Sequence, residues 1–229
     1  MHARASRGAR AALTALLLAA TAACAGGPPR DTAKSPATGA SPLERAALAD
    51  GDLPDYQVSA VKTAGGASGQ PTSDTARCQP LAGVMGDRPS PEALATVNRG
   101  LGSSRTPGLA VSASVSSYDP ADARRLLDAL RAAVADCGEG FTARVEGRSG
   151  RYSDVTAVPY GTGGDETVSW TTTGTTRGLR VPLHMVVVRK DAFVLRFMAL
   201  DLGRDGPPAP RVPREIANRQ LAKLTALRD

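Results

Sequence analysis

Residues 179–200, LRVPLHMVVVRKDAFVLRFMAL, decide how the chain is expected to fold. Two apolar runs, 179–188 and 192–200, flank Arg189-Lys190-Asp191, and a connection of that length suits a tight β-hairpin. Parts of both runs are apolar at consecutive positions, as in central strands that are covered on both faces. The stretch therefore predicts an antiparallel pair of strands at the centre of a sheet.

Further strands are expected before this hairpin. Leu109, Val111, Ala113 and Val115 alternate with serines, which is the period of a half-buried strand. The Gly- and Ser-rich residues 63–75 are expected to form a surface loop. The remaining strands are expected at residues 56–61, 141–146, 152–158 and 167–173.

Residues 119–138 have the strongest helix pattern. Asp119 is in an N-cap position, Pro120 opens the helix and Gly138 ends it. The apolar positions between them recur at helical spacing and form one stripe: Ala123, Leu126, Leu127, Leu130, Val134 and Cys137. The sequence thus predicts an α+β fold, with a mainly antiparallel sheet packed against helices as an α/β sandwich. Shorter helices are expected at residues 41–50, 78–85 and 91–99, and a last one from Pro213 onward.

The first 23 residues have the pattern of a secretory signal peptide. Arg4, Arg7 and Arg10 precede the uncharged, apolar residues 11–23, a run too short to span a bilayer as a stable helix. The expected organisation is a signal peptide at 1–23, a flexible tether at 24–40 that is rich in Gly, Pro, Ser and Thr, and a single domain at 41–229.

Cys24 stands at the end of the signal peptide. Thr21-Ala22-Ala23 leads into it and resembles the lipobox of bacterial lipoproteins, although the family usually has Leu where this chain has Thr21. The resemblance implies that the Cys24 thiol carries a fatty-acyl (palmitate) anchor and holds the protein on the outer face of the cell membrane. The alternative is an ordinary cleavage site of the Ala-x-Ala kind, with Cys24 removed or incidental.

The cysteine count agrees with lipidation of Cys24. Three cysteines in an exported protein leave one over, and lipidation accounts for the odd one. Cys78 and Cys137 then remain, and two thiols in one small exported domain are expected to pair as a disulfide. The alternative is two buried free thiols.

Composition argues against nucleic acid as a partner. The formal net charge of +6 falls to +3 once the three arginines of the signal peptide are removed, and the remaining charges are mixed along the chain. Aromatic residues make up 3% of the chain, too few for a base-stacking platform. The Arg-, Ala-, Gly- and Pro-rich composition is typical of a GC-rich genome, such as that of an actinobacterium.

Sequence signals for catalysis are weak. His184 is the single histidine after the signal peptide, and it lies in an apolar strand, where a structural role is expected. Ser59 and Lys62 match the Ser-x-x-Lys of penicillin-recognising enzymes, but that motif's partner motifs are absent. Asp165 and Glu166 match no calcium loop. No catalytic residue, metal or cofactor is therefore expected.

Four residues are candidates for contact with a ligand. Trp170 is the one tryptophan, and Tyr152 and Tyr160 lie on neighbouring segments; with His184 they form the candidate set. Amphipathic rings at a cleft often contact ligands, but a lone tryptophan in a small domain is more often part of the core.

Several segments resemble the sensor-like exported lipoproteins of actinobacteria, which are related to the extracellular domain of PknH-type receptor kinases. These are Leu53-Pro54-Asp55-Tyr56, Cys78-Gln79-Pro80-Leu81, the helix from Tyr118-Asp119 to Cys137, and residues 165–170. The resemblance spans about residues 41–229 and implies an α/β sandwich with a cleft for an unidentified ligand. Kinase-linked members have two disulfides and a transmembrane helix. This chain has one possible disulfide pair and no second apolar span, so no signalling role is implied.

The expected function is a membrane-anchored extracytoplasmic lipoprotein with a non-catalytic, sensor-like domain that binds an unknown small molecule or protein. One alternative is a cell-envelope hydrolase that uses Ser59 or a carboxylate pair. Another is a structural or assembly lipoprotein that binds a second protein.

Overall fold

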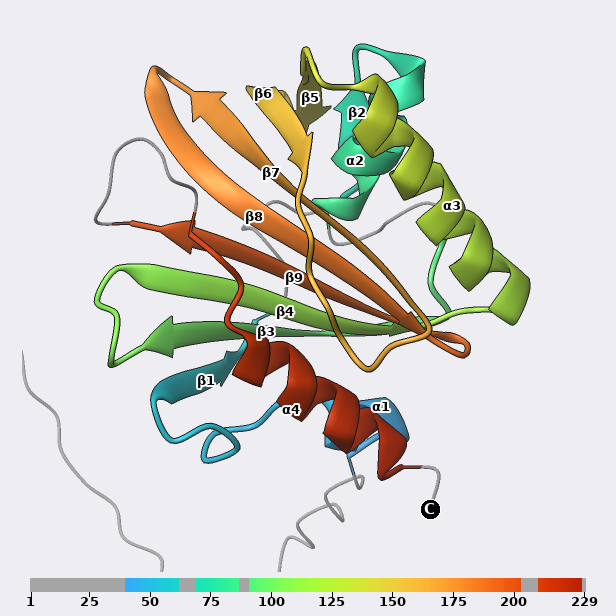
Figure 1. Ribbon diagram of the computed structural model, residues 1–229, viewed down its shortest axis with the longest axis vertical. Coiled ribbons are helices and arrows are strands. Elements are labelled where there is room, and N and C mark those ends of the chain that lie inside the picture. Colours follow the sequence, from blue (N-terminus) through green and yellow to red (C-terminus); the bar gives the residue numbers. More distant parts are fainter. Residues whose placement is uncertain (1–39, 62–68, 87–90, 203–209, 228–229) are drawn as a thin grey trace, which may run out of the picture. The chain divides into compact units, whose positions relative to one another are not determined.

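One antiparallel sheet organises the computed structural model, which describes residues 40–61, 69–86, 91–202 and 210–227 (Figure 1). Within these residues the sheet has nine strands, in the order β1-β3-β4-β9-β8-β7-β6-β5-β2. Their bounds are β1 (Tyr56–Ala60), β2 (Thr72–Ser73), β3 (Ala95–Ser103), β4 (Leu109–Ser117), β5 (Phe141–Val145), β6 (Arg148–Ala157), β7 (Glu166–Thr176), β8 (Leu179–Lys190) and β9 (Phe193–Asp201).

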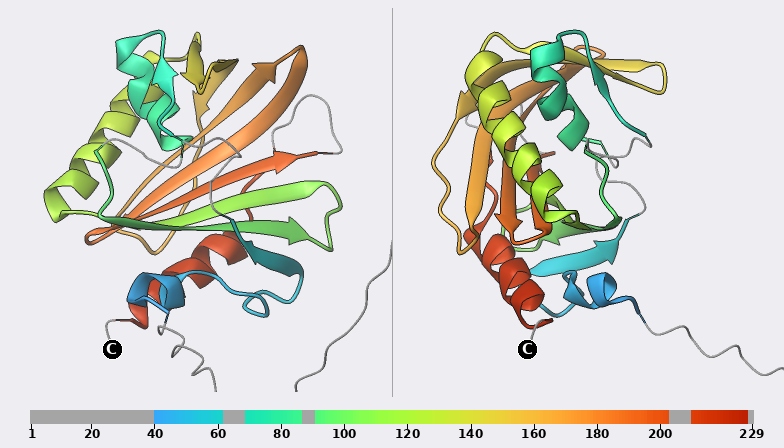
Figure 2. Two further views of the ribbon diagram at one scale, coloured as in Figure 1. Left: turned by 180° about the vertical axis from the view of Figure 1, so that it is seen from behind. Right: turned by 90° about the vertical axis from the view of Figure 1, so that its right-hand side faces the viewer.

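Helices cover both faces of the sheet, and Figure 2 shows them from two further sides. On one face α3 (Pro120–Asp136) packs with α2 (Gln79–Val84), which follows a 3₁₀ turn at Ala76–Cys78. On the other face α4 (Arg214–Thr225) packs with α1 (Pro42–Ala46). The fold is therefore the α+β sandwich that the sequence predicts.

The hairpin of β8 and β9 forms the centre of the sheet, as predicted. Along β8, Met185 and Val187 belong to the core under α3, whereas Val186 and Val188 belong to the core under α4. All four side chains are at most 1% exposed. Because successive strand residues point to opposite faces, a continuous apolar run is what two covered faces require.

A disulfide between Cys78 and Cys137 joins the end of α3 to the start of α2, as predicted. Its Cα atoms are 5.9 Å apart and the two cysteines are 59 residues apart in the sequence. The apolar stripe of α3 places Cys137 on the buried side of the helix, and both cysteines are at most 2% exposed. The bridge therefore closes the core under α3 at one end.

The helix predicted at residues 91–99 is wrong, because this segment contains the start of β3. Val97, Arg99 and Leu101 point to the α4 face, opposite Val115, Ala113 and Val111 of β4. The arginine in the middle of this alternation conceals the strand period. Its guanidinium is accommodated because Nε donates to the Leu48 carbonyl at 2.8 Å and Nη2 pairs with Glu44.

Two other predicted segments differ in extent. The helix expected at residues 41–50 ends at Ala46, and the loop expected at 63–75 contains β2, which pairs with β5. The signal peptide, Cys24 and all of the tether except Ala40 fall outside the described residues, so the predictions for them stay predictions. Across the segments that the structure describes, no helix combines the length and the apolar character needed to cross a membrane.

Candidate functional site

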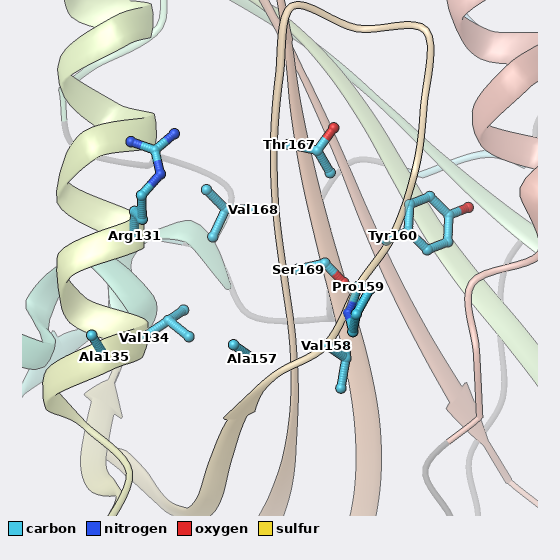
Figure 3. Close-up of a pocket in the computed structure, with 10 residues that line it drawn as sticks. All are labelled: Arg131, Val134, Ala135, Ala157, Val158, Pro159, Tyr160, Thr167, Val168 and Ser169. Carbon is cyan, nitrogen blue, oxygen red and sulfur yellow. The ribbon is translucent and has the colours of Figure 1, made fainter.

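A cavity of about 520 Å³ lies between α3 and the segment that links β6 to β7 (Figure 3). We call it the α3 cavity. Its walls come from α3, from residues 157–160 and from the start of β7. The lining residues are Arg131, Val134, Ala135, Ala157, Val158, Pro159, Tyr160, Thr167, Val168 and Ser169.

The cavity exists because β6 and β7 separate. Their pairing reaches Ala157 opposite Trp170, and the Val158 amide then donates to the Ser169 carbonyl at 3.0 Å. Pro159 has no amide hydrogen with which to continue the ladder. From there the chain leaves β7 and returns only at Asp165. The first residues of β7 therefore have a paired strand on the β8 side alone.

The walls of the cavity are mainly apolar. Val134 and Ala135 contribute the α3 side, and Val158 and Val168 contribute the sheet side, as Figure 3 shows. Polar lining residues are few: Arg131, and Thr167 and Ser169, whose hydroxyls are bonded to Thr162 at 2.9 Å and to His184 at 2.8 Å. An apolar hollow with a few placed polar groups is the usual character of a small-molecule site.

Arg131 is held at the cavity by two carboxylates. Its guanidinium nitrogens lie 2.7 Å from Asp128 on α3 and 3.1 Å from Glu166 on β7. Glu166 also binds Arg189 at 2.8 Å. Burial opposes the ionisation of Glu166, but the hydrogen bonds from Arg131 and Arg189 outweigh it and hold the pKa of this carboxyl below its ordinary value. The network fixes α3 against the start of β7.

Tyr160 fastens the linking segment to α4. The ring is buried, and its hydroxyl donates to the Pro213 carbonyl at 3.4 Å. The Arg214 guanidinium lies 6.0 Å from the ring centroid, within the range of a cation–π contact. Burial raises the pKa of Tyr160 to about 12, so this side chain stays neutral at physiological pH.

Behind Ser169 lies the buried side chain of His184. The Val212 amide donates to Nδ1 at 2.9 Å, so Nδ1 carries the lone pair. A neutral imidazole then has its proton on Nε2, which lies 2.8 Å from Ser169 Oγ and donates to it. Burial, with a smaller contribution from Arg211, lowers the pKa of His184 to about 4, which keeps the ring neutral.

This tautomer is the wrong one for nucleophilic catalysis. A serine is activated when its hydroxyl donates to a basic ring nitrogen, but here Ser169 receives the proton of Nε2. The basic nitrogen, Nδ1, is occupied by the Val212 amide. The pair therefore has a structural geometry.

The four ligand candidates from the sequence do not meet in one place. Tyr160 lines the α3 cavity. Trp170 is fully buried in the core under α3, and within the described residues its Nε1 has no hydrogen-bond partner. Tyr152 is half-buried and stacks on Phe141, with the ring centroids 5.2 Å apart. His184 reaches the cavity only through Ser169, and the roles of all four in ligand binding remain predictions.

Other candidate chemistry is dispersed or already neutralised. Ser59 lies on the edge strand β1 and donates to the Gly100 carbonyl at 3.3 Å, while Lys62 is outside the described residues. Asp165 is paired with Arg189 and Lys190 at 3.1 and 3.0 Å. No group of three or more His, Cys, Asp or Glu side chains in the described segments is placed to hold a metal ion.

The sequence interpretation missed most of the lining residues. Arg131 and Ala135 look like surface positions of an amphipathic helix, and Thr167 and Ser169 look like ordinary strand residues. One usable signal was Pro159, followed by the Gly-rich residues 161–164 between two expected strands. Such a segment indicates that the two strands diverge.

Two solved structures are similar in fold to this chain. No family model and no curated protein matches the sequence. The extracellular domain of PknH from Mycobacterium tuberculosis aligns with 12% identity and a TM-score of 0.46, over 76% of this chain and 85% of that chain. The Rv0999 ortholog from Mycobacterium smegmatis aligns with 16% identity and a TM-score of 0.40, over 76% of this chain and 90% of that chain.

Proposed function

We propose that the protein is a membrane-anchored extracytoplasmic lipoprotein whose domain binds a small, largely apolar ligand in the α3 cavity and performs no covalent chemistry. The anchor is the lipid on Cys24, and the tether at residues 24–40 separates the domain from the membrane. The proposal of ligand binding rests on the structure, and the proposal of a lipid anchor rests on the sequence.

The observation that carries the binding proposal is the α3 cavity itself. Its volume of about 520 Å³ is within the usual range for small-molecule sites. Its walls are mainly apolar, and the Arg131 guanidinium beside them is paired with Asp128 and Glu166. These features favour a largely apolar molecule with a small polar group that can reach the Arg131 ion pair.

A fluorescent probe of that chemistry tests the proposal. Anilinonaphthalene sulfonate combines aromatic rings with an anion, and its emission rises in an apolar site. We expect saturable binding of one probe per domain. Ala135→Trp places a large ring in the cavity mouth and should abolish this binding.

Ala132 offers a matched control for this experiment. It is an exposed residue of the same helix and does not line the cavity. Ala132→Trp adds the same ring to α3 and should bind the probe as the wild type does. Equal probe binding by all three proteins would contradict a site in the α3 cavity.

Cell fractionation tests the anchor separately. Wild-type protein should sediment with membranes and incorporate labelled palmitate. Cys24→Ala should do neither, because the acylated thiol is missing. A Cys24→Ala protein that stays fully membrane-bound would contradict lipid anchoring, whatever the result with the fluorescent probe.

A further inference from the structure

Two tight turns meet at one end of the sheet and concentrate positive charge there. One joins β5 to β6 at Glu146-Gly147, and the other joins β7 to β8 at Arg177-Gly178. Residues 144–151 and 176–180 contain five arginines and one acid, Glu146. We call this surface the arginine end; its arginines are Arg144, Arg148, Arg151, Arg177 and Arg180.

The arginine end is rigidly built. Both central residues of each turn have positive φ, which are 49° and 73° at 146–147 and 49° and 81° at 177–178. Two-residue turns of this kind match the twist of the flanking strands and fix their register. The arginines therefore stand on paired strands and short turns rather than on a long loop.

Strand register places three of the arginines on one face. Arg151 lies opposite Thr175, and Thr175 lies opposite Arg180. Arg144 lies opposite Ser149, two residues before Arg151 and on the same side of β6. All three arginines are exposed. Further along the strands, α4 covers the same face of the sheet. At the arginine end this face is uncovered and carries guanidinium and hydroxyl groups.

Most of these arginines lack an acidic partner. Arg148 pairs with Glu146 at 3.2 Å, and the charge of Arg144 helps to lower the pKa of Asp74, whereas Arg151, Arg177 and Arg180 form no ion pair with any described residue. Elsewhere in the domain, arginines commonly bind carboxylates: Arg99, Arg105, Arg125, Arg131, Arg189 and Arg219 all do. The arginine end therefore has an uncompensated positive charge.

Between the two turns is a hollow of about 490 Å³, lined by Gly147, Arg148, Ser149, Thr176 and Arg177. Guanidinium and hydroxyl donors are the groups that bind phosphate. Beside the hollow, Leu179 is 56% exposed. An uncovered apolar side chain beside arginines is typical of a surface that contacts the interface of a lipid bilayer.

We propose that the arginine end docks on an anionic phospholipid surface. Lipid phosphates bind around Arg148 and Arg177, the remaining arginines contact neighbouring headgroups, and Leu179 enters the interfacial layer. The positive charge favours an anionic surface, and the exposed Leu179 favours a bilayer over a soluble polyanion. This contact depends neither on Cys24 nor on the α3 cavity.

Vesicle sedimentation of the domain without its anchor tests the proposal. The described residues from 40 onward form one compact unit with both cores and the disulfide, so this domain is a suitable sample. It should bind phosphatidylglycerol-containing vesicles and not pure phosphatidylcholine vesicles, and binding should weaken with added salt. Arg177→Ser with Arg180→Ser should reduce the affinity about thirtyfold, which is about fivefold for each arginine.

Arg45→Ser with Arg124→Ser is the charge-matched control, because both residues are exposed and lie on α1 and α3. This control should keep nearly all of the vesicle affinity. An equal loss in both double variants would contradict a docking surface at the arginine end. Equal binding to both kinds of vesicle, or binding to soluble polyphosphate without binding to vesicles, would also contradict the proposal.

A fluorescence experiment reports on Leu179 directly. Leu179→Trp should shift its emission to shorter wavelength when phosphatidylglycerol-containing vesicles are added. Leu94, which directly precedes β3 and is 69% exposed, provides the comparison. Leu94→Trp should show no shift, and an identical response of the two variants would rule out insertion through the turn of β7 and β8.

Discussion

Ser169 Oγ lies 2.8 Å from His184 Nε2, and the proton between them belongs to the histidine. A serine that accepts from the ring has no base to activate it. We therefore expect a fluorophosphonate probe to label neither Ser169 nor Ser59. Labelling of either residue, lost in the matching Ser→Ala variant, would show a serine hydrolase instead.

The neutral state of His184 makes stability depend on pH. Its pKa is about 4 in the folded domain against an ordinary value of 6.5, so between these pH values the unfolded chain binds a proton that the folded domain does not. Stability from this group is therefore complete above about pH 6.5 and falls as the pH drops toward 4, by up to about 3 kcal/mol. Denaturant unfolding across this range measures the effect.

His184→Gln is the control for that measurement. It removes the titrating ring, while the carboxylates with lowered pKa values, such as Asp52 and Glu166, remain in both proteins. The variant should be less stable at pH 7 but should have a flatter pH profile between 6.5 and 4. Parallel profiles for the two proteins would mean that His184 does not cause the loss.

Removal of the disulfide should lower the free energy of unfolding. Cys78 and Cys137 are 59 residues apart, and closing a loop of that length stabilises a fold by about 4 kcal/mol through the entropy of the unfolded chain. Cys78→Ala with Cys137→Ala, or the reduced wild type, should therefore unfold at much lower denaturant concentration. Two free thiols in the exported protein, seen by mass analysis without reductant, would contradict the bridge.

Tyr118 carries a buried hydroxyl with no hydrogen-bond partner in the described part of the chain. An unsatisfied buried polar group costs about 1 kcal/mol or more, so Tyr118→Phe should increase the free energy of unfolding by about that amount. Tyr56→Phe is the comparison, because the Tyr56 hydroxyl donates to Glu215 at 2.9 Å. That variant should be unchanged or slightly less stable. Destabilisation by Tyr118→Phe alone would indicate a partner for its hydroxyl.

Local sequence patterns predict much of this fold. The apolar stripe of α3, the residues Asp119 and Gly138 at its ends, and the apolar run of β8 can all be recognised from residues that are close in the sequence. β3 was missed because Arg99 lies in the middle of its buried alternation and is accommodated by Leu48 and Glu44, which are about fifty residues away.

The α3 cavity is harder to predict. It depends on where β6 leaves β7 and on how far α3 stands from the sheet, and both are results of tertiary packing. Tyr160 was named as a candidate because it is an aromatic residue near a strand. Arg131 and Ser169 have no distinguishing sequence pattern, and only the folded arrangement brings them to the same cavity.

Backbone amide spectra of the domain during titration with anilinonaphthalene sulfonate test the central claim most directly. If the α3 cavity is the binding site, the amide signals that shift will be those of its lining, such as Ala135, Ala157, Thr167 and Val168, and Ala135→Trp will remove the shifts. Shifts confined to other surfaces, or shifts that persist in Ala135→Trp, would contradict the proposal that this cavity binds the ligand.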